Sequence, residues 1–208
     1  RPLLDLYRKV DALPYVKKSF IGSGVRYDLL LHRSDNEAVN KGNKDYTYEL
    51  IAHHVSGRLK VAPEHTSDEV LKVMRKPSFA LFKEFKRTFD RINESESLKQ
   101  QLIPYFISSH PGCEPQDMAE LAIETKQLNF QLEQVQDFTP TPMTLATEMY
   151  YTGLNPYTMK PIYVARTQPE KLAQRQFFFW YKPDARNQIK RDLQKMNRLD
   201  LADKLFKK

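Results

Sequence analysis

The sequence contains very little cysteine, since Cys113 is the single one among 208 residues. One thiol can form neither an intrachain disulfide nor a cysteine-ligated metal or iron–sulfur site within this chain. No apolar run approaches the roughly 18 residues that a membrane-spanning helix needs. The N-terminus RPLLDLYRKV also lacks the apolar core of a secretory signal. These absences predict a cytoplasmic protein that does not insert into membranes.

An initiator methionine, exact repeats and low-complexity segments are missing too. The beginning RPLL fits a fragment or a trimmed chain better than a natural N-terminus, although processing or a disordered start gives the same pattern. With 40% hydrophobic and 12% aromatic residues, the chain is long enough to bury the core of one domain and to carry an appendage.

Positive charge is in excess and gathers near the C-terminus. The formal net charge is +7, and segment 168–208 holds 11 Lys plus Arg against 5 Asp plus Glu. Such a balance attracts RNA or another acidic macromolecule. A solvated basic helical surface is the commoner explanation, so both interpretations stay open here.

Strand patterns and helix patterns alternate along the chain. Short β-prone runs cover residues 16–24, 58–62, 101–107 and 135–138. Helical patterns follow at 46–55, behind Thr66, behind Ser78, at 118–132 and at 144–151. Parallel neighbours need crossover connections, which are normally helices. The alternation therefore predicts an α/β fold with a parallel sheet.

Two further helix features are expected. Thr66 and Glu69 have the spacing of a capping box, and segment 184–208 reads as two short helices. Two apolar faces have helical spacing, one near the N-terminus and one behind Ser78, and the second is expected to be core. The first comprises Leu3, Leu6, Tyr7 and Val10, and the second comprises Phe79, Phe82, Phe85, Phe89 and Ile92.

Polar or glycine-bearing clusters follow all four predicted strands. They read SGVRYD, APEHT, SSHPG and TPTPM. Because the loops after parallel strands share one edge of the sheet, that edge is the predicted site. Four strands cannot close a barrel, and the first would leave a bare parallel edge, so part of the sheet is expected to lie upstream of this sequence.

Five stretches carry a resemblance to a known family. Taken in order they are FIGSGVRYDLLL, LKVAPEHTSDEVLKVMRKPS, LIPYFISSHPGC, QVQDFTPTPMTLATEMYYTGLNP and the FFFWYKP tail. Together they resemble the C-terminal part of the YgiQ-type radical SAM proteins, a bacterial family whose substrate is not established. On this resemblance, residues 1–152 are the later part of a partial, TIM-like parallel barrel, and 153–208 are a basic, aromatic and helical extension.

The resemblance implies chemistry that depends on residues outside this chain. In such proteins a Cys-x3-Cys-x2-Cys loop holds a [4Fe-4S] cluster, which binds S-adenosylmethionine (SAM) at its open iron. One-electron reduction then yields methionine and a 5′-deoxyadenosyl radical. That cysteine loop is absent here, and Cys113 cannot replace it. The isolated chain is therefore expected to hold no cluster and to be inactive.

The resemblance also suggests which residues contact SAM or substrate. For each of them a structural role is the alternative: a solvated or backbone-bonded side chain, a capping box at Thr66, an ion pair of Arg26 with Asp28, a turn at Gly112, or a rigid connector at TPTPM. Cys113 is expected to be a small buried residue. The candidate contacts are Ser23, Arg26, Glu64, His65, Thr66, Ser109, His110, Gly112, Thr139 and Thr141.

Two other functions compete with the radical enzyme. Glu64, His65 and His110 on one face offer ligands to zinc, which suggests a metal-dependent hydrolase, but their spacing lacks an H-E-x-x-H type signature. Alternatively, the aromatic and basic segment 168–208 binds RNA or an acidic partner, with Phe177 to Trp180 either stacking on bases or packing the tail onto its domain.

Overall fold

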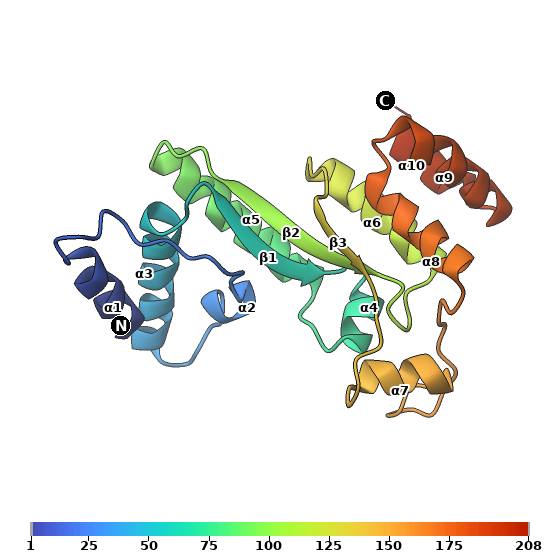
Figure 1. The fold of residues 1–208 in the computed structure, drawn as a ribbon, viewed down its shortest axis with the longest axis horizontal. Coiled ribbons are helices and arrows are strands. Elements are labelled where there is room, and N and C mark those ends of the chain that lie inside the picture. The colour runs from blue at the N-terminus through green and yellow to red at the C-terminus, as the bar shows by residue number, and fades with distance from the viewer. Residues whose placement is uncertain (1, 208) are drawn as a thin grey trace. The chain divides into compact units, whose positions relative to one another are not determined.

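The computed structural model describes residues 2–207, which form helices and a three-stranded sheet (Figure 1). The sheet has the order β1-β2-β3, with β1 at Arg58–Glu64, β2 at Gln101–Ser108 and β3 at Gln134–Asp137. β2 and β3 pair in parallel, with Tyr105 opposite Gln134 and Ser108 opposite Asp137. The predicted α/β class with parallel strands is confirmed.

Helices precede, connect and follow the strands. Every helix in residues 2–207 is too short or too polar to span a bilayer. The α-helices are α1 Pro2–Asp11, α2 Tyr27–Leu30, α3 Glu37–His53, α4 Asp68–Val73, α5 Phe79–Ser95, α6 Pro115–Gln127, α7 Leu145–Thr152, α8 Gln168–Arg175, α9 Pro183–Lys195 and α10 Leu199–Phe206, and a 3₁₀-helix, η1, covers Gln176–Phe179.

The chain divides into two compact units. The first comprises Arg1–Ala62 and Ala80–Pro104, and the second comprises Pro63–Phe79 and Tyr105–Lys208. The first unit thus holds α1, α2, α3 and most of α5. The second holds α4 and every element from α6 onward. Both β1 and β2 continue from the first unit into the second.

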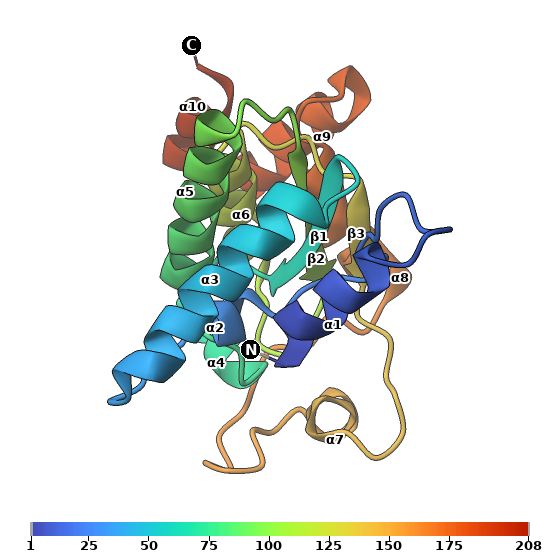
Figure 2. The same ribbon diagram turned by 90° about the vertical axis from the view of Figure 1, so that its left-hand side faces the viewer.

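The core of the first unit forms around the phenylalanine stripe of α5. Phe82, Phe85 and Phe89 are buried as predicted, and the ring of Tyr27 packs on Phe82 and Phe85 at 5.8 and 5.7 Å between centroids. α1 lies against α3 (Figure 2). The predicted helix is confirmed, although Leu3 and Leu6 are each 52% exposed and Leu4 is the buried leucine of α1.

The core of the second unit forms between α6 and the C-terminal helices. Met118 and Leu121 of α6 are buried, as their helical spacing predicted, and α6 contacts both η1 and α10. The tail contributes Phe177, Phe178, Ile189, Leu193, Leu201 and Leu205 to this core. The aromatic tail therefore packs onto its own unit. Residues on both sides of position 152 belong to that unit, and the division at that position stays a prediction.

The β-prone run at 16–24 does not form a strand. Its backbone makes a hydrogen bond from Ile21 N to His54 O of 2.9 Å, and the next residue, Val25, forms one isolated parallel bridge with Val61. Gly22 and Gly24 are exposed and bring no side chain to bury, and Phe20 is 51% exposed. Because strand stability depends on side-chain packing, this segment stays irregular.

Two helix starts also differ from the predictions. α4 begins at Asp68 with Ser67 at the N-cap, so the capping box of Thr66 and Glu69 is wrong. Glu69 instead pairs with Lys72 at 2.6 Å. α3 begins nine residues before the predicted start at 46, because Asn36 caps it by accepting the backbone N–H of Ala38 at 2.9 Å.

Candidate functional site

The polar residues after β1 and β2 gather in the second unit. Glu64 ends β1, and His65 follows it. Ser108 ends β2, and the loop 109–113 follows it. Both Glu64 and Ser109 have positive φ angles, 68° and 60°, so the chain turns sharply as it leaves each strand. The predicted meeting of these loops at one edge of the sheet holds for this pair of strands.

His65 is a fully buried, neutral imidazole. Its Nδ1 accepts the backbone N–H of Ser67 at 3.0 Å, which leaves the ring proton on Nε2. Nε2 lies 3.5 Å from Sγ of Cys113. Burial, together with the neighbouring His110, lowers the pKa of His65 to about 3. The side chain therefore fastens the β1 loop to the β2 loop and carries no charge near neutral pH.

Cys113 and Gln174 form the centre of this buried cluster. The thiol donates to Oε1 of Gln174 at 3.3 Å, and the Cys113 carbonyl accepts from Gln174 Nε2 at 2.7 Å. Burial raises the pKa of the Cys113 thiol, so it stays protonated and unreactive. The prediction that Cys113 is a small buried residue is confirmed.

Ser109 and His110 keep hydrogen-bonding capacity that the fold does not use. The backbone N–H of Ser109 donates to Gln174 Oε1 at 2.8 Å, but its buried Oγ has no hydrogen-bond partner within the described residues. His110 Nδ1 donates to the carbonyl of Pro111 at 2.8 Å, so Nε2 of the neutral ring retains its lone pair. Burial lowers the pKa of His110, and its ring stands edge-on to Phe138 at 5.1 Å.

The two carboxylate oxygens of Glu64 differ in their hydrogen bonding. Oε1 accepts from Lys76 Nζ at 3.0 Å, while Oε2 is buried and has no hydrogen-bond partner among residues 2–207. A buried acceptor without a donor is costly. Glu64 Oε2 and Ser109 Oγ are thus buried polar atoms at these strand ends to which a ligand could hydrogen-bond.

Gly112 has a structural role in this arrangement. Its φ is +86°, and a Cβ there would lie 3.2 Å from Ile162 Cδ1 and 3.3 Å from Val73 Cγ2. The glycine thus allows a turn and the close approach of two apolar side chains. Its backbone N–H is also used, since it donates to the Tyr163 carbonyl at 2.8 Å.

The remaining sequence candidates do not join this cluster. Thr139 and Thr141 are exposed and donate to the nearby carbonyls of Asp137 and Thr139, at 3.5 and 3.4 Å. Thr66 is half-buried beside His65. Ser23 and Arg26 belong to the first unit.

Arg26 is already engaged within that first unit. Its Nε donates to Asp28 Oδ1 at 2.8 Å. This hydrogen bond lowers the pKa of Asp28 and raises the pKa of Arg26. The alternative that Arg26 supports the structure by pairing with Asp28 is therefore the one observed.

Sequence reasoning missed a polar chain at the end of β3. Ser108 Oγ donates to Asp137 Oδ1 at 2.6 Å, and Arg175 Nη1 donates to Asp137 Oδ2 at 3.0 Å. An acidic residue at the end of a β-prone run was the available signal for Asp137. Neither Arg175 nor Gln174 has a local signal, because both reach the strand ends only through the packing of α8.

The zinc-hydrolase alternative finds no ligand set in the described part of the chain. Residues 2–207 contain no group of three or more His, Cys, Asp or Glu side chains placed to hold a metal ion. Of the proposed ligands, His65 Nδ1 and Glu64 Oε1 are occupied by Ser67 and Lys76.

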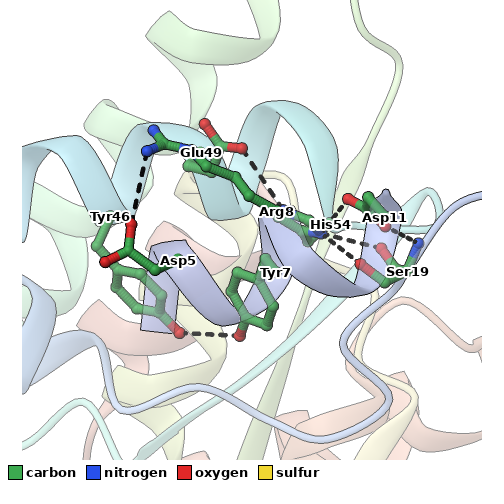
Figure 3. A network of polar contacts seen from close by, with 8 residues as sticks. All are labelled: Asp5, Tyr7, Arg8, Asp11, Ser19, Tyr46, Glu49 and His54. Atoms are coloured by element: carbon green, nitrogen blue, oxygen red, sulfur yellow. Dashed lines mark hydrogen bonds and ion pairs between the residues drawn. The ribbon is translucent and has the colours of Figure 1, made fainter. Parts of the chain in front are cut away.

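A second buried polar cluster surrounds His54 in the first unit (Figure 3). Nδ1 of this histidine lies 3.1 Å from Ser19 Oγ and 3.0 Å from the Ser19 carbonyl, and Nε2 lies 3.7 Å from Glu49 Oε1. The Tyr7 ring packs on the imidazole at 4.3 Å. These contacts join α1 and the segment after it to the end of α3, which is a structural task.

Known proteins resemble this chain over nearly its full length. Residues 133–204 match a domain of unknown function, DUF3362. A UPF0313 protein of Bacteroides thetaiotaomicron is 67% identical over 207 residues, and one of Porphyromonas gingivalis is 63% identical over 206. A UPF0313 protein of Methanosarcina mazei is 41% identical over 207 residues.

The alignments cover the whole of this chain but only part of the relatives. They include 99% to 100% of the chain and 32% to 33% of each of those three proteins. The chain thus spans about a third of the length of the curated relatives it matches. No solved structure matches it.

Proposed function

We propose that this chain forms the later strands and the C-terminal extension of a radical SAM enzyme, which works in the cytoplasm on a substrate yet to be identified. The proposal rests on the resemblance to YgiQ-type proteins, whose segments in this chain coincide with β1, β2, β3 and the loops after them. The observation that carries it is the unused hydrogen-bonding capacity at two of those strand ends, at Glu64 Oε2 and Ser109 Oγ.

The residues at the strand ends fit SAM by their chemistry. Glu64 supplies a carboxylate for the ammonium group, and His110 Nε2 and Ser109 Oγ supply acceptors for the ribose hydroxyls. Ser109 also has a hydroxyl proton to donate. The loops that carry these side chains are joined by the buried residues His65, Cys113 and Gln174, so little ordering is needed on binding.

The residues do not fit the iron–sulfur cluster. Cluster iron requires several thiolates, and Cys113 is one protonated thiol already bonded to Gln174. When bound to a reduced cluster, SAM supplies a 5′-deoxyadenosyl radical. This chain would position SAM and shield it from water, and we expect the isolated chain to yield no 5′-deoxyadenosine after anaerobic iron–sulfur reconstitution with a reductant.

SAM affinity tests the binding residues. In a reconstituted Bacteroides thetaiotaomicron UPF0313 protein whose matching region is replaced by this chain, Glu64→Gln removes a charge-assisted hydrogen bond, which weakens SAM binding about tenfold. The matched control is Glu148→Gln in the same protein, because Glu148 is exposed. Equal effects of the two changes, measured by calorimetry, would refute the assignment of Glu64.

A specific observation supports a second activity, RNA binding by the tail. Lys182, Arg186 and Lys190 are spaced four residues apart at and along α9, and none lies within 4.0 Å of a carboxylate among residues 2–207. Lys182 lies over the Phe179 ring at 4.6 Å. Arg186 and Lys190 lie over the Phe206 ring at 5.0 and 5.6 Å. Cations beside aromatic rings suit single-stranded RNA.

Salt dependence tests this second activity. Each phosphate contact that is lost should lower the slope of log affinity against log salt by about 0.7 for single strands. Changing Lys182, Arg186 and Lys190 to glutamine should therefore flatten the slope for a labelled RNA, while the same change at Lys17, Lys18 and Lys41 should not. No RNA binding at low salt refutes the activity, and binding of polyglutamate instead of RNA points to an acidic protein partner.

A further inference from the structure

A cavity of about 480 Å³ lies in the first unit, between the end of α2 with the segment after it, α3 and α5. Its volume falls within the range of small-molecule sites. The lining residues are Leu30, Leu31, His32, Arg33, Asn40, Asn43, Lys44, Thr47, Glu84, Thr88, Arg91 and Ile92. None of them belongs to the sites described above.

Positive charge dominates the cavity lining. Arg33, Lys44 and Arg91 come from three separate segments, and among the lining residues they face the carboxylate of Glu84 alone. Arg33 pairs with Glu84 at 3.6 Å. Neither Lys44 nor Arg91 lies within 4.0 Å of a carboxylate in residues 2–207, and Arg91 contacts Thr88 Oγ1 at 3.5 Å. Lys44 and Arg91 thus line the cavity without an ion pair of their own, since Glu84 pairs with Arg33.

The neutral lining divides into a polar and an apolar part. Asn40 and Asn43 are fixed by hydrogen bonds from their Nδ2 atoms to the carbonyls of Ser34 and His32, at 2.7 and 3.0 Å. The hydroxyl of buried Thr47 donates to the Asn43 carbonyl at 2.7 Å. Leu30, Leu31 and Ile92 supply apolar surface in the same cavity.

We propose that this cavity binds an organic phosphate of nucleotide size. Lys44 and Arg91 would neutralise and hydrogen-bond the phosphate oxygens, for which the Arg fork and the Lys ammonium are both well suited. The organic part would lie against Leu30 and Leu31, whose side chains are partly open to water, with buried Ile92 behind them. This assignment does not depend on the radical SAM proposal.

Calorimetric titration of the 208-residue chain tests the site with ADP, pyrophosphate and citrate as probes. ADP should bind more tightly than pyrophosphate, because only ADP uses the apolar surface, and citrate should bind weakest. Equal binding of ADP and pyrophosphate would overturn the role of the leucines. Citrate binding as tightly as ADP, or no binding of ADP at millimolar concentration, would overturn the phosphate site.

Matched variants separate this site from general attraction to a basic protein. The double change Lys44→Gln with Arg91→Gln removes both uncompensated cations and should weaken ADP binding by about tenfold or more. Lys17→Gln with Lys99→Gln makes the same charge change at exposed positions outside the cavity and should leave the affinity within about twofold, as screened surface charges do. An equal loss in both doubles would overturn the proposal. All four positions are exposed, and near-UV circular dichroism checks that each variant is folded.

Discussion

At the residue scale, the buried frame behind the candidate site depends on Gln174. Its side chain accepts from the Ser109 N–H and donates to the Cys113 carbonyl, at 2.8 and 2.7 Å, and is 0% exposed. This one amide thereby satisfies groups from a loop more than sixty residues away. The fold of the β2 loop and the docking of α8 are consequently linked through a single side chain.

Gln174→Ala should lower the free energy of unfolding by about 2–4 kcal/mol, because it leaves two buried backbone groups without partners. Urea unfolding followed by circular dichroism measures the loss. Gln168→Ala removes the same side chain from the exposed first turn of the same helix and serves as the control. A loss for Gln174→Ala no larger than for the control contradicts the account of the frame.

His65 gives the stability a predictable pH dependence. Its pKa is about 3 in the folded chain and about 6.5 when unfolded. Above pH 6.5 both states are neutral at this residue, so it contributes no pH dependence. Between about pH 6.5 and 3 the unfolded state binds the extra proton, so stability falls by up to about 1.4 kcal/mol per pH unit as pH falls.

Urea unfolding at a series of pH values, for wild type and His65→Asn, should show the smaller acid dependence in the variant. The control is His53→Asn, since His53 is exposed. An unchanged slope for His65→Asn relative to wild type would mean that His65 protonates normally in the fold.

Part of the candidate site could be predicted from the sequence, residue by residue. Glu64, His65, Ser109 and His110 were predictable as a group, because each follows a recognisable strand and parallel strands bring such residues to one edge. Gln174 and the Asp137–Arg175 pair were not, because α8 is distant in sequence from β2 and β3 and reaches their ends only through tertiary packing. Arg26 was assigned two alternatives, and the nearby Asp28 carboxylate decided between them.

At the scale of elements, periodicity predicted what is deeply buried and failed where burial is partial. The Phe82, Phe85 and Phe89 stripe is buried because a long amphipathic helix has one way to hide its apolar face. In α1 the hydrophobic spacing placed Leu3 and Leu6 on one face, but Leu4 is the buried leucine, and Tyr7 packs on His54 and Tyr46. The β-prone run at 16–24 had the composition of a strand, but Phe20 is exposed and the two glycines bring no side chain to bury.

The C-terminal helices should behave as part of the second unit. Leu193 of α9 is fully buried, and Leu193→Ala should cost about 2–5 kcal/mol, as other buried leucines do. Leu172→Ala is the matched control, because Leu172 is 53% exposed. If chemical denaturation gives the same midpoint for both variants, then the tail is a loose appendage.

At the scale of the whole molecule, the chain combines a parallel α/β sheet with a basic helical tail, and it matches about a third of each of three UPF0313 proteins. Under the proposed function, the parallel strand ends would supply acceptors for a cationic, hydroxyl-bearing ligand, and this chain would not supply the thiolates of a cluster. The α/β class was predictable from strand and helix alternation alone. The division into units was not, because β1 and β2 each contribute to both.

The most direct test of the central proposal is the formation of 5′-deoxyadenosine by the Bacteroides thetaiotaomicron UPF0313 protein. The protein would be reconstituted anaerobically with iron and sulfide, reduced, and supplied with SAM, and the product would be quantified by mass spectrometry. We predict 5′-deoxyadenosine, and a lower yield at subsaturating SAM when the residues aligned with Glu64 and Ser109 are changed to glutamine and alanine. A fully reconstituted protein that forms no 5′-deoxyadenosine, or one that assembles no cluster, would contradict the account.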